Sequence, residues 1–180
     1  MNKNRKSPRL KGYDYTTPGY YFVTAMVKNR ECVFGEIQNG KMVLNDWGKI
    51  AYQNWKEIPI HFAHVELDEF IIMPNHVHGI ICITDVNVVV VVVGAQHAAP
   101  LQQQQRQIQQ PVAGSIPTIV RSYKSSVTNF IHRTGNPQFS WQRSFHDHII
   151  RNNDELNRIR YYIQQNPARW LQNQKEKNAA

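Results

Sequence analysis

Two histidines stand one residue apart in the apolar run MPNHVHGIICI, residues 73–83. Alternate side chains of a β-strand share a face, so His76 and His78 would project together while Val77 points away. Neutral imidazole nitrogens are good metal ligands, and a strand holds them with little freedom. The spacing predicts half of a metal site, against the alternative that each histidine is satisfied by a backbone group. The same spacing occurs in zinc, copper and non-haem iron sites.

The spacing recurs in FHDH, where His146 and His148 flank Asp147. Strand periodicity gives this second-tier site the same formal standing as the first pair. We rank it second because no nearby pair of helical residues would complete it as cleanly as a pair in the last predicted helix would complete the first site.

That last helix offers a phenol and an amide. At 100° per residue, Tyr162 and Asn166 lie roughly 40° apart, on the flank of an apolar stripe. A phenol is a possible nucleophile, and an amide oxygen can bind a metal. The alternative is that Tyr162 packs at the edge of the core and Asn166 helps to end the helix. Of the competing tyrosines, Tyr161 is expected at the surface and Tyr123 in the core.

Composition indicates one basic domain with a polyanionic partner. The chain has 180 residues, and its 21 lysines and arginines against 13 acidic residues give a net charge of +8. Such a balance favours nucleic acid first and an anionic membrane surface second, although a merely basic protein would look similar. Two cysteines without paired spacing, no secretory leader and no membrane-spanning run favour a cytoplasmic protein, associated with the nucleoid when bound to DNA.

Candidate DNA contacts lie in the second half of the chain. Arg121, Lys124 and Ser125 share one polar helix face that suits phosphate contacts, although solvated helix faces look alike. Trp141 offers a ring for stacking on exposed bases, and Arg143 adds a nearby cation.

Periodicity and turn signals predict the elements that must position these residues. We expect strands over 19–27, 64–73, 76–84 and 139–151, a hairpin turning at Asn39–Gly40, and helices from Asn45 or Asp46 to about Glu57, from Ser115 to about Gly135, and from about Asn152 to Asn166–Pro167. This order fits an α+β, ferredoxin-like sandwich whose central antiparallel sheet has helices packed mainly on one face.

The composition changes sharply over 86–114, where a valine run precedes a glutamine-rich stretch. We read this stretch as a low-complexity insertion without chemistry. The expected organisation is a basic N-terminal arm over 1–18, a single domain over 19–170 and a polar C-terminal tail over 171–180.

The motifs MPNHVHGI, WQRSFHDHIIR and YYIQQNPARW, in this order and separation, resemble the single-tyrosine HUH transposases, in particular the REP-associated tyrosine transposases. HUH denotes two histidines around a bulky hydrophobic residue. The resemblance runs from about Tyr13 to Trp170, apart from the insertion. It implies an α+β domain that cleaves and rejoins single-stranded or hairpin DNA without ATP, as a monomer or homodimer.

By that resemblance, Tyr162 is the nucleophile, and His76, His78 and Asn166 bind a divalent cation, Mg²⁺ or Mn²⁺. Attack by Tyr162 would give a 5'-phosphotyrosine intermediate, which keeps the bond energy for strand transfer and requires no nucleotide cofactor. The expected enzyme is a tyrosine transposase that serves DNA transposition or processes hairpin repeats. Two alternatives stay open: a non-catalytic nucleic-acid-binding or regulatory domain, and a metal-dependent hydrolase that uses both histidine pairs.

Overall fold

The computed structural model describes residue 10, residues 12–85 and residues 112–178, with side chains as far as residue 172. Most of the predicted basic arm and nearly all of the predicted insertion therefore lie outside the described residues.

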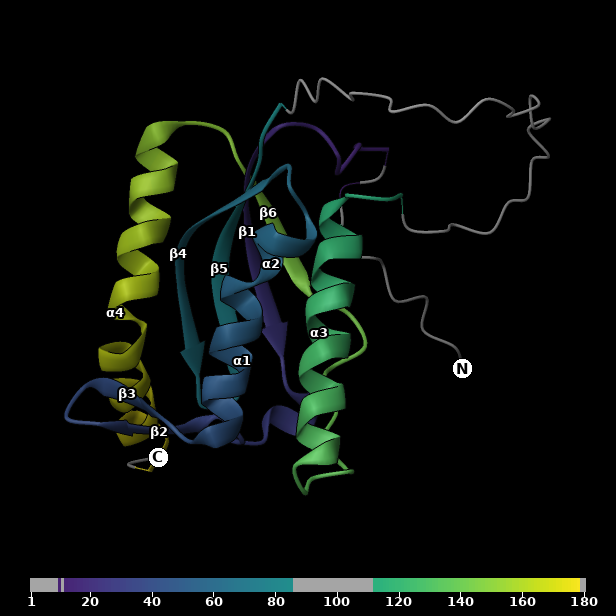
Figure 1. Ribbon diagram of the computed structural model, residues 1–180. Helices are drawn as coiled ribbons and strands as arrows, with labels where there is room; N and C mark the ends of the chain where they lie inside the picture. The colour runs from purple at the N-terminus through teal and green to yellow at the C-terminus, as the bar shows by residue number, and fades with distance from the viewer. Residues whose placement is uncertain (1–9, 11, 86–111, 179–180) are drawn as a thin grey trace, which may run out of the picture.

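A four-stranded antiparallel sheet forms the centre of the fold (Figure 1). Its strands follow the order β4 (Val65–Met73), β5 (His76–Ile83), β1 (Gly19–Met26) and β6 (His146–Ile150). The sequence pattern of β5 is almost continuously apolar because this inner strand is covered on both faces. The predicted α+β class and the predicted antiparallel sheet are confirmed.

A separate hairpin joins β2 (Gly35–Gln38) to β3 (Lys41–Leu44). Asn39 and Gly40 both have positive φ, 50° and 74°, which a two-residue turn of this kind requires. The predicted turn is therefore confirmed.

Three helices cover one face of the sheet: α1 (Asp46–Lys56), α2 (Ile58–His61) and α3 (Ile116–Arg133). The Asn45 side chain caps α1 by accepting a hydrogen bond from the Gly48 amide at 2.9 Å. The chain continues directly into α2, with Pro59 in the first turn of that helix. Apolar residues of α3 at helical spacing, Phe130 among them, would form one buried stripe, but Phe130 is 48% exposed near the end of the helix.

Helix α4 (Asn153–Asn178) covers the opposite face (Figure 1). Its buried residues Leu156 and Ile163 pack with Ile80 and Ile150 of the sheet. Arg160 donates to the carboxylate of Asp68, with Nε 2.8 Å from Oδ1, and so ties the helix to β4. We predicted that the helices pack mainly on one face of the sheet. Three helices do so, and α4 alone covers the second face.

The predicted end of the last helix is wrong. Proline removes one backbone hydrogen bond and disfavours a helix interior, yet α4 passes through Pro167 and continues to Asn178. Asn166 and Pro167 are both buried, so tertiary packing holds the chain helical where local preference would stop it. Residues 171–178, expected as a tail, are therefore part of this helix.

The last predicted strand is shorter than expected, because only residues 146–150 of 139–151 pair in the sheet. Trp141 forms an isolated bridge to Val27 instead.

Across the described part of the chain, we find no helix that combines the length and apolarity needed to cross a bilayer.

Candidate active site

The two histidines of β5 face α4, with Ile80 on the same side of the strand. Their ring centroids are 4.5 Å apart, and each residue is only 7% exposed. Val77 between them is fully buried in the core on the other face. The structure thus brings the two imidazoles together as strand periodicity predicts, at the layer between sheet and helix.

The amide of Asn75 orients His76. Its Nδ2 donates to the carbonyl oxygen of Arg30 at 2.9 Å, so Oδ1 is left to accept from Nδ1 of His76 at 2.7 Å. A ring that donates through Nδ1 keeps its lone pair on Nε2. The Asn75–His76 hydrogen bond therefore leaves Nε2 as the nitrogen available to a metal or a substrate.

His78 is held by its neighbour across the sheet. Thr24 of β1 pairs with His78 in register, and its hydroxyl lies 2.8 Å from Nδ1. Burial lowers the pKa of His78 to about 3, with a further contribution from His76. Burial also lowers the pKa of His76 to about 4, helped by the positive charge of Arg30. Both rings are therefore neutral at physiological pH, the state in which imidazole binds metals.

Tyr162 reaches this pair from α4. Its hydroxyl lies 3.5 Å from Nε2 of His78, and the two ring centroids are 5.4 Å apart. Phe22 of β1 meets the phenol ring edge-on at 6.1 Å and so contacts it from a second strand. The phenol and the histidine pair thus lie together although 84 positions separate Tyr162 from His78.

The other two tyrosines lie elsewhere. Tyr161 is 59% exposed, as predicted. Tyr123 is buried in the core and donates to the carbonyl oxygen of Ala51 at 3.2 Å, and burial raises its pKa well above the usual range. Neither phenol is placed to act with the histidines.

Asn166 lies one helical turn after Tyr162 and is only 7% exposed. The next turn brings the Trp170 ring to 5.9 Å from the ring of His76. Because Tyr162 contacts one histidine and Trp170 the other, Asn166 occupies the intervening turn on the same face. Within the described residues its side-chain amide has no hydrogen-bond partner, so its oxygen is available to a ligand.

The side chains of His76, His78 and Asn166 fit a divalent cation whose remaining coordination positions are filled by phosphate oxygens. Two imidazole nitrogens and one amide oxygen provide three neutral ligands, which leave the charge of the cation uncompensated. In the described parts of the chain, no group of three or more His, Cys, Asp or Glu side chains could hold a metal. A site without carboxylates suits an anionic substrate whose oxygens complete the coordination.

The second histidine pair does not build a comparable site. His146 and His148 lie on the α4 side of β6, and Asp147 lies on the opposite side of that strand. His148 is instead paired with Glu155 at the start of α4, at 2.7 Å. The three residues are therefore not brought together around one point.

The predicted DNA contacts of α3 lie on the far side of the sheet from the histidines. The amino group of Lys124 donates to the carbonyl oxygen of Gln142 at 2.6 Å and thereby holds the loop before β6. Arg121, Ser125 and Arg143 are exposed but do not join the site.

The stacking role of Trp141 is wrong, because this residue is only 9% exposed. Its Nε1 donates to the carbonyl oxygen of Lys124 at 3.1 Å, and its ring packs among Phe34, Tyr123 and Phe139. A ring buried in this way offers no free face to a base.

Four residues around the site escaped the sequence reasoning: Thr24, Asn75, Arg169 and Trp170. The first two hold the histidine rings, and the last two follow Pro167, where the helix was expected to have ended. Arg169 places its guanidinium carbon 5.5 Å from the centre of the Tyr162 ring. Asn75, Arg169 and Trp170 stand within the quoted motifs, which was their only signal in the sequence, and Thr24 had none.

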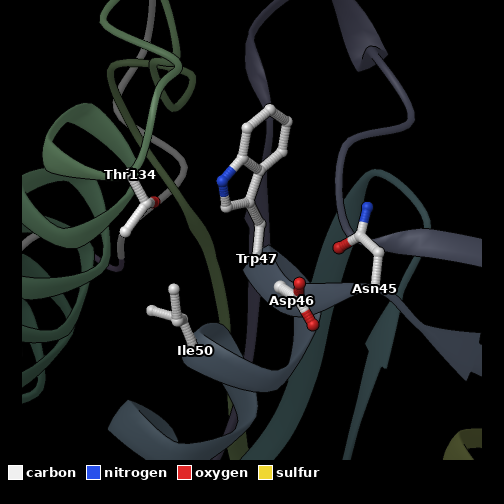
Figure 2. Close-up of a pocket in the computed structure, with 5 residues that line it drawn as sticks. All are labelled: Asn45, Asp46, Trp47, Ile50 and Thr134. Carbon is white, nitrogen blue, oxygen red and sulfur yellow. The ribbon is translucent and has the colours of Figure 1, made fainter.

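A cavity of about 450 Å³ lies away from this site, between the start of α1 and the end of α3. Figure 2 shows Trp47 rising between Thr134 on one side and Asn45 on the other, with Asp46 and Ile50 below. The Asn45 amide is already committed to capping α1 and to the carbonyl oxygen of Val33. We assign no chemistry to this cavity.

Comparison with known proteins places the chain in a family. No family model matches the sequence. A Haemophilus influenzae (strain Rd) protein described only as uncharacterized is 42% identical over 172 residues, which cover 95% of this chain and 92% of that protein. The chain belongs to the same family as this relative.

Among solved structures, a REP-associated tyrosine transposase bound to a REP hairpin has the same arrangement. The similarity has a TM-score of 0.56 at 17% identity and covers 94% of this chain and 74% of that chain. The protein therefore has the fold of the REP-associated tyrosine transposases, as its motifs predict.

Proposed function

We propose that the protein is a tyrosine transposase that cleaves single-stranded DNA and rejoins it through a covalent link to Tyr162. The observation that carries this proposal is the 3.5 Å approach of the Tyr162 hydroxyl to Nε2 of His78, beside a second neutral imidazole. The shared fold with a transposase supports it. The activity serves DNA transposition or the processing of hairpin repeats.

The chemistry is a transesterification. The Tyr162 oxygen forms a bond to phosphorus as the bond from phosphorus to the 3'-oxygen of the preceding nucleotide breaks. The phenol loses its proton and the departing 3'-oxygen gains one, which leaves a free 3'-hydroxyl and a 5'-phosphotyrosine. Attack by a 3'-hydroxyl on that ester reverses the step and joins strands, so no nucleotide cofactor is consumed.

A phosphodiester repels nucleophiles because its oxygens are negatively charged. His76, His78 and Asn166 are the residues that would hold Mg²⁺ or Mn²⁺, which when bound would neutralise charge on the phosphate oxygens. Burial keeps both imidazoles neutral and able to donate lone pairs. Phe22 and His78 fix the phenol ring by edge contacts, which limits its motion before attack.

We propose hairpin DNA with a single-stranded flank as the substrate. The solved transposase with this fold is bound to a REP hairpin. The net charge of +8 favours a polyanionic partner. The proposed site draws all its residues from one chain, so a monomer would suffice for cleavage.

The decisive experiment detects the covalent adduct. A hairpin oligonucleotide with a flanking single strand is labelled at its 3' end, because the 3' fragment is the one that stays on the protein. Incubation with Mn²⁺ or Mg²⁺ and denaturing electrophoresis should give a labelled protein band, which chelation with EDTA abolishes. Tyr162→Phe should lose the band, whereas the matched exposed variant Tyr161→Phe should retain it.

An undiminished adduct in Tyr162→Phe would remove this residue from the proposed role. The hydrolase alternative makes a different forecast: DNA cleavage without a labelled protein, which survives Tyr162→Phe and is lost in His76→Ala. DNA binding without cleavage under either cation would favour the non-catalytic alternative.

A further inference from the structure

The helix beyond Pro167 brings two more side chains to the nucleophile. The guanidinium carbon of Arg169 lies 5.5 Å from the centre of the Tyr162 ring. The Trp170 ring lies 5.9 Å from the His76 ring, inclined by 36°. Arg169 is exposed and Trp170 is partly exposed, so both are accessible from solvent.

Helical geometry places these residues on one continuous surface. At 100° per residue, the residues at 162, 166, 169 and 170 fall within an arc of roughly 100°. That arc faces the histidine pair, because Tyr162 contacts His78 and Trp170 contacts His76. A strand that presents its phosphate to Tyr162 therefore also meets the side chains at 169 and 170.

We propose that Arg169 and Trp170 bind the nucleotide next to the scissile bond, with Arg169 holding a phosphate and Trp170 stacking on a base. This inference rests on the proposed function and adds the residues that seat the substrate there. Both lie in the turn that follows Pro167, so the continuation of α4 past this proline is what delivers them to the site.

The charge on Arg169 is available for a ligand. The guanidinium of Arg160 on the same helix forms an ion pair with Asp68, whereas Arg169 has no carboxylate partner among the described residues. The planar guanidinium matches two phosphate oxygens at once and also tolerates an aromatic neighbour. A phosphate at the Tyr162 hydroxyl would supply the missing anion.

The position of the Trp170 indole suits it to stacking on a nucleobase. Stacking on aromatic side chains is the main sequence-tolerant contact to single strands. Of the other tryptophans, Trp55 and Trp141 are buried, and Trp47 lies at the cavity on the other side of the sheet. Trp170 is thus the tryptophan that combines exposure with contact to the histidine pair.

The test separates binding from chemistry. Binding of the 3'-labelled hairpin oligonucleotide is followed by fluorescence anisotropy in EDTA, with Tyr162→Phe as the parent so that no adduct forms. We expect Trp170→Ala to weaken binding roughly 10-fold, and Trp170→Phe, which keeps a ring, to recover part of the loss. Arg169→Ala should weaken binding and lower the dependence on log salt concentration by about one unit of slope.

Matched controls identify the contacts. Arg133→Ala removes an exposed arginine at the end of α3, on the other side of the sheet, and should leave binding nearly unchanged. An oligonucleotide with one abasic position beside the scissile phosphate should erase the difference between the parent and Trp170→Ala. Variants that are folded by circular dichroism and bind like the parent would overturn the inference while leaving the proposed function intact. A parent that binds neither hairpin nor single-stranded DNA would overturn both.

Discussion

The side chain of Asn75 joins His76 to the short 3-10 helix Lys28–Arg30: it accepts from Nδ1 of the histidine at 2.7 Å and donates to the carbonyl oxygen of Arg30 at 2.9 Å. Partners of this kind fix the ring that binds a metal, and their loss costs 10- to 100-fold in metal affinity. We expect Asn75→Ala to weaken Mn²⁺ binding by roughly 10-fold or more, measured by electron paramagnetic resonance titration without DNA.

Asn129→Ala serves as the control for this change, because Asn129 is exposed on α3. It should bind Mn²⁺ like the unaltered protein. A folded Asn75→Ala protein with unchanged affinity for Mn²⁺ would show that the amide does not orient the ring.

Thr24 should act on the other histidine in the same way. Its hydroxyl lies 2.8 Å from Nδ1 of His78, so Thr24→Val removes the contact while it keeps shape and strand preference. We expect a several-fold loss of Mn²⁺ affinity by calorimetric titration with the fold unchanged. Thr24→Ser, which keeps the hydroxyl, should retain most of the affinity, and equal losses in both variants would count against the hydrogen bond.

Gly79, directly after the histidine pair, is required by packing. A Cβ atom there would lie 2.3 Å from a ring carbon of Trp55, which is fully buried. Overpacking of this kind costs about 1–3 kcal/mol. We expect Gly79→Ala to lower the free energy of unfolding by about 2 kcal/mol, measured by urea denaturation.

Trp55→Phe removes the ring atoms that collide with the new methyl group. The double variant should therefore lose less stability than the sum of the two single losses. Strict additivity of the two losses would mean that the clash is relieved in some other way.

Local patterns were sufficient for the histidines because strand periodicity is a local property. It placed His76 and His78 on one face without any knowledge of what covers that face. The partner layer is a tertiary fact: Tyr162 meets His78 only because α4 crosses the sheet on the side that α1 and α3 leave open. Motif resemblance, not periodicity, brought the tyrosine to the same site.

The errors have the same origin. Pro167 stays within α4 because buried packing outweighs its local preference, and Arg169 and Trp170 were overlooked as a result. Trp141 looked like a strand residue with a free ring, but hydrogen bonds between α3 and the following loop draw it into the core. Periodicity predicts the face of a helix or strand on which a residue lies. It does not predict how far the neighbouring elements that cover this face extend.

The docking of α4 depends on a bulge in β4. The register of β4 against β5 shifts between Leu67 and Phe70, and this irregularity turns both Asp68 and Glu69 toward the helix. Arg160 binds Asp68, and Gln164, one turn later, donates to Glu69 at 3.2 Å. The same helix carries Tyr162, so these contacts help to hold the nucleophile over the sheet.

Acid should weaken this docking in a defined range. The hydrogen bonds from Arg160 hold the pKa of Asp68 below its ordinary value of 3.8, against the opposing effect of burial. A lowered folded-state pKa contributes stability that is complete above the unfolded value and is lost as the pH falls through the folded one. The contribution of Asp68 should therefore be constant above about pH 5 and decline below about pH 4.

Asp68→Asn isolates this contribution. The Arg160 side chain is 38% exposed, so solvent screens the pair, and we expect a loss of about 1 kcal/mol at pH 7. Urea unfolding in metal-free buffer from pH 7 to pH 3 should show the gap between the two proteins closing below pH 4. Asp46→Asn, which breaks the exposed pair with Lys49, should cost little at any pH. A gap that persists undiminished at pH 3 would mean that Asp68 stabilises the helix by shape rather than by charge.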